Sequence, residues 1–287
     1  MDSIIELKNV SFVWGRGTPF EKKALDNISV SFERGKITGL IGHTGSGKST
    51  LVSMLNGILT PTVGRVLLDG KDVFDGKKCD PSVRFKVGLV MQYPEYQLFD
   101  DTVRSDIGFG PRNQGLGDEE IDARVQDAAR FAGVGEELLD KSPFELSGGQ
   151  MRRVAIAGII AMRPDVLVLD EPAAGLDPRG RVEILGRIKD YVRESGATVI
   201  LVSHSMEDMA QYCDNVVVMS HGNIVTTGTV DEVFSSPSLL IECGLQPPMV
   251  SKIASRLCEL GIKLKGSLYT VEAVADAIIE YQRRAEE

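Results

Sequence analysis

The residues with the clearest chemical signature form the segment "GHTGSGKST" at positions 42–50. The segment satisfies the spacing G-x-x-x-x-G-K-[ST], and it lies between the strand-like "KITGLI" and the helix-like "LVSMLNGIL", the context that this motif requires. Its glycines let backbone N–H groups close around phosphates, its lysine neutralises phosphate charge, and its serine hydroxyl can ligate Mg²⁺. The sequence therefore predicts a nucleotide-binding loop made of Gly42, His43, Thr44, Gly45, Ser46, Gly47, Lys48, Ser49 and Thr50.

Two carboxylates come at the end of another apolar run, "DVLVLDE". In a strand, Asp170 and Glu171 would face opposite sides, but at the strand's end the chain can turn and present both. We expect Asp170 to join Ser49 in holding Mg²⁺, and Glu171 to act on the attacking water, either as a general base or by positioning it. The alternative is that Asp170 and Glu171 are two solvated acids at the start of a loop. The nucleotide-binding motif at 42–50 disfavours this alternative.

Gln92 and His204 end the runs "KVGLVMQ" and "TVILVSH". A lone residue of either type at a strand end is more often structural than catalytic, but here neighbouring parallel strands would carry both toward the same crevice. We expect Gln92 to contact Mg²⁺ and the γ-phosphate, and His204 to contact the γ-phosphate and to hold Glu171 and the water. His43 and His221 lack comparable companions in the sequence, and their side chains are assigned ordinary structural roles.

A second glycine pair lies in "ELSGGQMRR", residues 145–153. No strand precedes it, it lacks the lysine, and it opens a helix-like segment. The hydroxyl of Ser147 and the amides of Gly148 and Gly149 at a helix N-terminus can bind a γ-phosphate but cannot hold a nucleotide alone. The other half of that site must come from elsewhere.

A parallel α/β sheet is needed to position these side chains. Short apolar runs separated by helical segments are typical of buried parallel strands. Strand alternation in "IIELKNVSFVW", "ISVSFERG" and "GRVLLDGKDV" predicts a small antiparallel sheet beside this core. Residues 93–162 are predicted as a helical insertion. After residue 235 the tail carries two amphipathic helix candidates, the second capped by Thr270, so we expect domains at 1–235 and 236–287.

Composition narrows the classes of function. The chain of 287 residues has a net charge of −9, from 32 basic and 41 acidic residues, which disfavours sequence-independent binding to nucleic acid. The longest apolar run, Val154 to Met162, is far shorter than the ~20 residues of a spanning helix. The N-terminus shows no secretion signal, so we expect a cytosolic chain in which the four scattered cysteines stay reduced, without disulfide or metal.

With these motifs in order, the sequence resembles the ATP-binding cassette ATPases over residues 1 to about 235. The resemblance rests on "GHTGSGKST", Gln92, "LSGGQ", "VLVLDEP", "AGLD" and His204. It implies a P-loop NTPase fold with a RecA-like parallel-sheet core, and a head-to-tail dimer. ATP with Mg²⁺ would lie between the phosphate loop of one subunit and the Ser147, Gly148, Gly149 and Gln150 of the other. It also implies that Trp14 stacks on adenine, although Trp14 could be plain core, and that Asp177 communicates across the dimer interface.

A narrower likeness covers nearly the whole chain. "QYPEYQLFDDTV", "DIGFGPRNQG", "SPFELSGGQMRRVAIAG" and the C-terminal extension resemble the energy-coupling factor transporter ATPases, in particular the second of their two paired subunits. The resemblance implies a peripheral subunit at the cytoplasmic face of the cell membrane. Its partners would be a sister ATPase, or a second copy, and a membrane protein that joins both to a substrate-binding component importing vitamins or transition-metal ions.

The resemblance also implies that a groove after Gln92 receives a coupling helix of the membrane partner. Four residues there, Glu95, Gln97, Asp100 and Asp101, are candidates for contacts with basic partner residues, or else form a solvated acidic turn. The alternative function is a soluble ATPase of this class acting on nucleic acid or ribosomes. Relatives of that kind generally carry long coiled coils or two cassettes in one chain, and this chain has neither. The direction of transport rests on the resemblance alone, and the cargo is not recorded in the sequence.

Overall fold

The computed structural model describes residues 2–76 and 78–286 and contains a six-stranded sheet in the order β12-β11-β3-β10-β9-β8. Five strands run parallel and only β12 is antiparallel. The four predicted strands of this sheet are confirmed, and β11 and β12 extend it. The bounds are β3 Ile37–Gly42, β8 Val87–Val90, β9 Val166–Asp170, β10 Thr198–Val202, β11 Asn215–Ser220 and β12 Asn223–Thr229.

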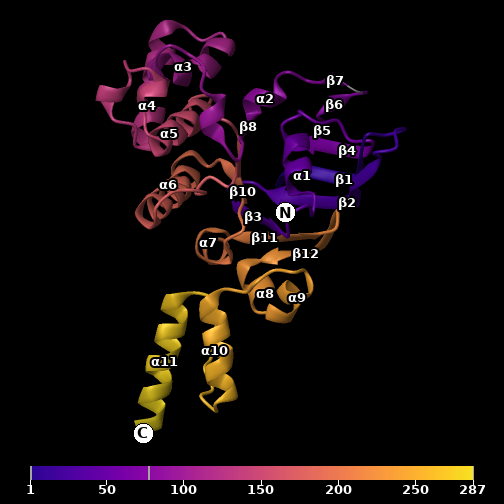
Figure 1. Ribbon diagram of the computed structural model, residues 1–287, viewed down its shortest axis with the longest axis vertical. Coiled ribbons are helices and arrows are strands. Elements are labelled where there is room, and N and C mark those ends of the chain that lie inside the picture. Colours follow the sequence, from indigo (N-terminus) through magenta and orange to yellow (C-terminus); the bar gives the residue numbers. More distant parts are fainter. Residues whose placement is uncertain (1, 77, 287) are drawn as a thin grey trace.

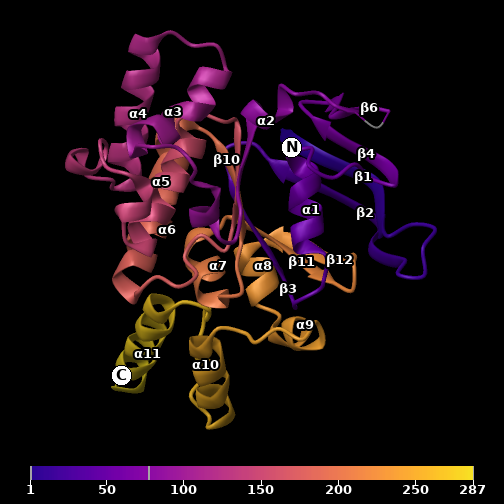
Figure 2. The ribbon, with the colours of Figure 1, turned by 45° about the horizontal axis from the view of Figure 1, so that its top comes forward.

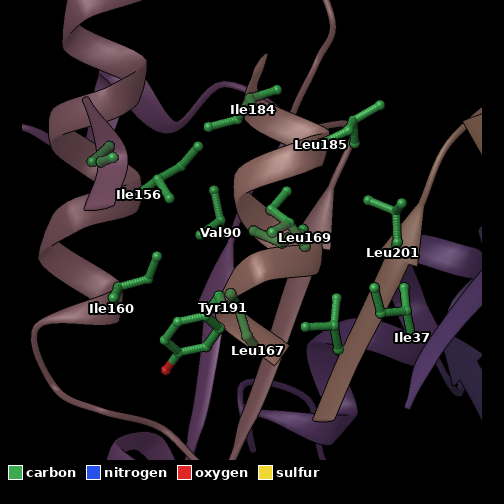
Figure 3. Close-up of a cluster of buried hydrophobic side chains, with 14 of the residues drawn as sticks. Ile37, Val90, Ile156, Ile160, Leu167, Leu169, Ile184, Leu185, Tyr191 and Leu201 are labelled. Atoms are coloured by element: carbon green, nitrogen blue, oxygen red, sulfur yellow. The ribbon is translucent and has the colours of Figure 1, made fainter. Parts of the chain in front are cut away.

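Alternate side chains of the parallel strands enter two different cores. In β9, Leu167 and Leu169 face the helices on one side, whereas Val166 and Val168 face the opposite side. The strands therefore read as continuous apolar runs, because both faces of the sheet are covered. Figure 3 shows the first core, in which side chains of the sheet meet those of two helices: Ile37, Val90, Leu167, Leu169 and Leu201 with Ile156, Ile160, Ile184, Leu185 and Tyr191.

The second core joins the parallel sheet to a four-stranded sheet in the order β2-β1-β4-β5. Its long strands pair antiparallel, as their alternation predicts. Helix α1 (Lys48–Leu55) directly follows the phosphate loop and buries its Leu51, Met54 and Leu55 in this core. The remaining bounds on this side are β1 Ser3–Trp14, β2 Lys22–Glu33, β4 Val63–Leu68, β5 Lys71–Asp72, β6 Phe74–Asp75, β7 Lys78–Cys79 and α2 Val83–Lys86.

Residues 93–162 are helical and lie on the far side of the parallel sheet from β1 and β2 (Figures 1 and 2). Helix α4 begins with three acidic residues, which favour a helix N-terminus, and ends at Gly133, whose φ of 71° suits glycine. Its buried face is formed by Val125, Ala128, Ala129 and Ala132. The bounds are η1 Pro94–Gln97, α3 Val103–Asn113, α4 Asp118–Ala132, η2 Glu136–Leu138, η3 Pro143–Glu145 and α5 Gly148–Ile160, followed after β9 by α6 Pro178–Ser195.

The C-terminal helices form a separate small layer. Helices α10 and α11 run side by side, share a cluster built around Ala254, Leu264, Val274 and Ala277, and project from the body (Figures 1 and 2). The Oγ1 of Thr270 accepts a hydrogen bond from the N–H of Ala273, as expected for a cap. Bounds here are α7 Met206–Tyr212, α8 Val230–Phe234, α9 Pro237–Glu242, α10 Met249–Glu259 and α11 Val271–Glu286.

Contacts with α7 and α8 attach this layer to the body, among them a hydrogen bond from Ser267 Oγ to Asp231 Oδ1. The N–H of Met249, at the start of α10, donates to Glu207 Oε1 on α7 at 3.2 Å, and the rings of Phe234 and Tyr269 are 5.9 Å apart. The division of the chain at residue 235 stays a prediction. Among the described residues, no helix is both long and apolar enough to span a bilayer.

Candidate nucleotide site

An open cavity of about 680 Å³ lies at the carboxyl ends of the parallel strands. The structure brings most of the predicted site residues into its wall, from segments far apart in the sequence. They are Trp14, His43, Thr44, Gly45, Gly47, Lys48, Ser49, Thr50, Gln92, Asp170, Glu171 and His204. The other two predicted loop residues, Gly42 and Ser46, are buried behind the wall. A side chain at Ser46 therefore cannot reach a ligand, and only its backbone remains available.

The phosphate loop is held in shape by its own lysine. Lys48 Nζ donates to the carbonyl oxygens of Gly42, at 2.6 Å, and His43, at 3.1 Å. An ammonium group has three N–H donors, so this geometry leaves one for a phosphate. Burial lowers the pKa of Lys48, and the nearby carboxylates of Glu171 and Asp170 oppose that effect. Gly47 has a φ of 107°, and a Cβ there would lie 2.8 Å from the carbonyl oxygen of Ala24, so this turn requires glycine.

Ser49 and Asp170 lie together across the cavity floor. The Ser49 hydroxyl is 3.4 Å from Asp170 Oδ2, although the two residues are 121 positions apart. Burial raises the pKa of Asp170, while the Ser49 hydroxyl and the Lys48 charge lower it. Hydroxyl and carboxylate oxygens are hard ligands of the kind that Mg²⁺ prefers, and Mg²⁺ commonly takes only one or two protein ligands with the rest from phosphate and water. The residues present therefore fit a nucleotide-bound Mg²⁺, with Gln92 in the same wall.

Glu171 has the most perturbed environment in the cavity. Its φ of 54° is a left-handed conformation that costs energy for a non-glycine residue and is common at functional sites. Its Oε1 is buried and finds no hydrogen-bond partner among the described residues, and it lies 3.7 Å from His204 Nε2. Burial, together with the nearby charge of Asp170, raises the pKa of Glu171 to about 6. Such a carboxylate can accept a proton near neutral pH, as a general base must.

Sequence reasoning missed five residues of this wall: Lys22, Lys23, Ala24, His221 and Gly222. The strand pairing of Trp14 with Lys22 places the lysines beside the tryptophan. The view that His43 and His221 lack companions is wrong. Their ring centroids are 4.6 Å apart, and the N–H of His221 donates to His43 Nε2 at 3.3 Å. The two histidines are 178 positions apart, and no sequence signal would have revealed this pairing.

The signature residues are not part of this cavity wall. Ser147, at the N-cap of α5, accepts from the N–H of Gln150 at 3.4 Å, while the Gln150 side chain accepts from the N–H of Ser147 at 2.9 Å. This reciprocal capping box fixes the start of the helix. Asp177 caps α6 by a single bond, in which its carboxylate accepts from the N–H of Gly180 at 2.7 Å. Ser147, Gly148 and Asp177 are exposed, and Gly149 and Gln150 are half-buried.

A second cavity, of about 530 Å³, opens between α2, β8, α3 and α5 after the Gln92 segment. Its wall is rich in apolar side chains, including Met91, Phe99 and Phe109. Two of the acidic residues predicted there to meet basic partner groups are already paired within the chain. Glu95 lies 3.3 Å from Arg152, and Asp100 lies 3.1 Å from Arg112. The apolar wall, rather than the acidic turn, is therefore the main feature that this cavity offers.

Comparison with known proteins agrees with this geometry. The family model described as ABC transporter matches residues 25–174, and one described as "AAA domain, putative AbiEii toxin, Type IV TA system" matches residues 140–209. The solved structure of cbiO1 from Clostridium perfringens, described as part of the ABC transporter complex cbiONQ, superposes with a TM-score of 0.75 at 38% identity, covering 91% of this chain and 98% of that one. The dimeric ATP-binding cassette MJ0796 bound to ADP and Pi superposes with a TM-score of 0.70 at 26% identity, covering 79% and 98%.

Fold and site thus define an ATP-binding cassette ATPase. The energy-coupling factor transporter ATP-binding protein EcfA2 of Caldanaerobacter subterraneus subsp. tengcongensis is 48% identical over 279 residues, which cover 97% of this chain and 98% of that protein. EcfA2 of Clostridium acetobutylicum is 49% identical over 276 residues, covering 96% of each. The chain belongs to the ABC transporter family and, within it, to the group of energy-coupling factor transporter ATP-binding proteins.

Proposed function

We propose that this chain is the ATP-hydrolysing subunit of an energy-coupling factor importer and powers uptake of a vitamin or a transition-metal ion through partner membrane proteins. The observation that carries the catalytic half of the proposal is the buried Oε1 of Glu171, which has no hydrogen-bond partner among the described residues and lies 3.7 Å from His204 Nε2, in a cavity whose wall also includes Lys48. The assembly half draws on the relatives, which are named as transporter ATP-binding proteins.

In this proposal each side chain of the cavity has one task. Trp14 stacks on adenine; it is 45% exposed and steadied by an edge contact with Phe12 at 4.9 Å. The loop amides and Lys48 hold the phosphates, and Ser49, Asp170 and Gln92 hold Mg²⁺, which supplies charge neutralisation on the β- and γ-phosphates. Glu171 orients the attacking water and accepts its proton. His204 contacts the γ-phosphate and holds Glu171 in position beside it.

The signature segment acts on the ATP of a second subunit. Among the described residues outside its own helical turn, a Cβ at Gly148 would meet nothing within 4 Å, and one at Gly149 would meet Leu176 alone, at 3.7 Å. Folding therefore does not require these glycines, whereas close approach of a ligand from outside would. The first N–H groups of α5 lack intrahelical acceptors and carry the positive end of the helix dipole, so they suit a γ-phosphate brought by a partner. The partner is a sister ATPase or a second copy of the chain.

The cavity beside Phe99 and Phe109 is the proposed dock for a helix of the membrane partner. The two rings make an edge contact with centroids 4.8 Å apart, and both are about half exposed. An apolar helix face of that partner would cover them, and the chain would then lie at the cytoplasmic face of the membrane. Exposed apolar residues of the extension, Met249, Ile253, Leu260 and Val271, fit a dimerisation surface that keeps the two ATPases joined when nucleotide leaves.

Co-purification tests the proposal. The tagged chain is expressed in the organism that encodes it and is extracted in detergent. We expect it to co-purify with an integral membrane protein. Its ATPase activity should rise when the complex is reconstituted in vesicles. Phe109→Glu should abolish the pull-down while leaving ATP binding intact. Val225→Glu, at an exposed apolar position on β12, is the matched control and should change neither. If no membrane protein accompanies the chain and it binds nucleic acid tightly in a salt-sensitive manner, the alternative of a soluble ATPase acting on nucleic acid or ribosomes replaces this one.

A further inference from the structure

A bidentate ion pair joins the first turns of α6 and α7. The Nε of Arg181 lies 2.9 Å from both carboxylate oxygens of Asp208, and its Nη2 lies 2.7 Å from Oδ2. The Asp208 side chain is 10% exposed and that of Arg181 is 39% exposed. A planar guanidinium that bonds a buried carboxylate through two nitrogens fixes both distance and orientation, which an isolated surface pair does not.

Each member of the pair lies one helical turn beyond a residue of the proposed machinery. Arg181 follows Asp177 by four positions, and its N–H donates to the Asp177 carbonyl at 2.9 Å. Asp208 follows His204 by four positions, and its N–H donates at 3.2 Å to the Oγ of Ser205, the cap of α7. A chain of hydrogen bonds therefore runs from exposed Asp177 to Ser205, which directly follows His204 in the sequence, and His204 Nε2 lies 3.7 Å from Glu171 Oε1.

Leu185 of α6 and Met206 of α7 belong to the same buried core, and the ion pair adds a link between the two helices at the surface. A cavity of about 560 Å³ opens at the junction and is lined from both sides, by Pro178, Arg181 and Val182 of α6 and by His204, Ser205 and Asp208 at the start of α7. Beside this opening, the ion pair is a direct side-chain bond between the two segments.

We propose that Arg181 and Asp208 are positioning residues that make the segments of Asp177 and His204 move as one unit. A displacement of Asp177 by a neighbouring subunit is then transmitted to His204 and so to the water held by Glu171. The inference rests on the proposed function, because it needs Asp177 at a subunit interface and His204 at the γ-phosphate. It adds two residues that do not line the nucleotide cavity.

A double-mutant cycle in the purified transporter complex tests this coupling. Arg181→Gln and Asp208→Asn should each lower kcat by about 10-fold to 100-fold, the usual effect of a small misplacement at a reaction centre, while the Kd for ATP stays within about 2-fold. The double variant should be no slower than the worse single variant, because residues that act as a unit are not additive. Arg181→Lys, which keeps the charge but loses the planar fork, should recover only part of the rate.

Matched controls separate positioning from general stability. Asp190 and Arg193 form an exposed pair on the same helix at 2.9 Å, so Asp190→Asn and Arg193→Gln should leave kcat unchanged. All variants are compared at a temperature where thermal unfolding shows them folded. Any of three results would overturn the inference. These are an unchanged kcat in both single variants, losses of kcat that add in the double variant, and a rise in the Kd for ATP that accounts for the lost activity. His204→Ala and Asp177→Ala are measured in parallel. If both variants keep full ATP turnover, the proposed function itself fails. If they lose turnover while the Arg181 and Asp208 variants keep it, only the inference is rejected.

Discussion

Glu171 Oε1 lies 3.7 Å from His204 Nε2, inside a wall where that oxygen has no hydrogen-bond partner among the described residues. The two residues follow neighbouring strands, β9 and β10, and the N–H of Glu171 donates to the carbonyl of Val202 at 3.0 Å. Burial raises the pKa of Glu171 to about 6, and burial lowers the pKa of His204. Both shifts favour the neutral form, so the nucleotide-free cavity favours removing charge from this pair.

The first prediction concerns stability in the absence of nucleotide and Mg²⁺. The pKa of Glu171 is raised in the folded state, so its ionised form disfavours folding at pH above about 6, and this penalty disappears as pH falls below the unfolded value of 4.5. Glu171→Gln should therefore increase the free energy of unfolding by about 2 kcal/mol at pH 8 and by little at pH 4.5. Thermal unfolding of both proteins in chelator across this range measures the difference.

A control of opposite sign is available on α6. Hydrogen bonds from Arg153, assisted by Arg187, lower the pKa of Glu183 to about 2, so its ionised form stabilises the folded state at every pH above 4.5. Glu183→Gln should lower the free energy of unfolding across pH 4.5 to 8, and the size of this decrease should not change over that range. A Glu171→Gln variant that is less stable at pH 8 than at pH 4.5, relative to the parent, would contradict the assigned environment.

The second prediction separates binding from hydrolysis at the same residue. Glu171→Gln keeps the size and one acceptor of the side chain but cannot take a proton, so ATP should bind with unchanged affinity while hydrolysis falls by at least about 100-fold. The variant should accumulate as the ATP-bound dimer, which size-exclusion chromatography with light scattering detects. Rapid turnover in an assembly whose two sites both carry the substitution would exclude the base and water-positioning roles.

The third prediction concerns the charge of the phosphate loop. Lys48→Ala removes the buried ammonium that bonds the Gly42 and His43 carbonyls and would reach the phosphates, so the Kd for ATP should rise by at least about 10-fold. Lys8→Ala removes an exposed lysine on β1 and serves as the control, with no change expected. Equilibrium titration with a fluorescent ATP analogue measures both. Unchanged affinity in Lys48→Ala would contradict the charge argument.

The fourth prediction uses two glycines that differ in what surrounds them. A Cβ at Gly47 would clash with Leu25 and Ala24, whereas one at Gly148 meets open space. Gly47→Ala should lower the melting temperature of the isolated chain, while Gly148→Ala should leave it unchanged, because alanine is at least as favourable as glycine in a helix. In the assembled complex, Gly148→Ala should nevertheless reduce ATP hydrolysis.

The same surface predicts where the loss of activity occurs. Ser147→Arg places a long side chain at the exposed start of α5, so it should spare nucleotide binding at this chain's own loop and damage hydrolysis at the loop of the partner. The affected site can be assigned in complexes where only one subunit carries Ser147→Arg. Lys48→Ala is added to one subunit or to the other, and the remaining ATP hydrolysis is compared. Loss confined to the chain's own site would overturn the shared-site reading.

Local sequence determined the parts of this protein that depend on short-range chemistry. The loop at 42–50 needs glycine where φ is positive and lysine where phosphates lie, and those requirements are visible within nine residues. Likewise, the apolar runs of β3, β8, β9 and β10 indicate strands that are buried on both faces. The spacing of Ser147 and Gln150 is that of a capping box.

Tertiary structure alone decided which distant residues meet. The His43–His221 contact, the pairing of Lys22 with Trp14, and the Arg181–Asp208 bond join segments whose sequence separation carries no periodic signal. The ion pairs of Glu95 with Arg152 and of Asp100 with Arg112 were likewise not visible in the sequence, and the partner contacts expected of the turn after Gln92 stay a prediction. The elevated pKa of Glu171 likewise follows from burial, which is a property of the packed chain and not of the letters "LDE".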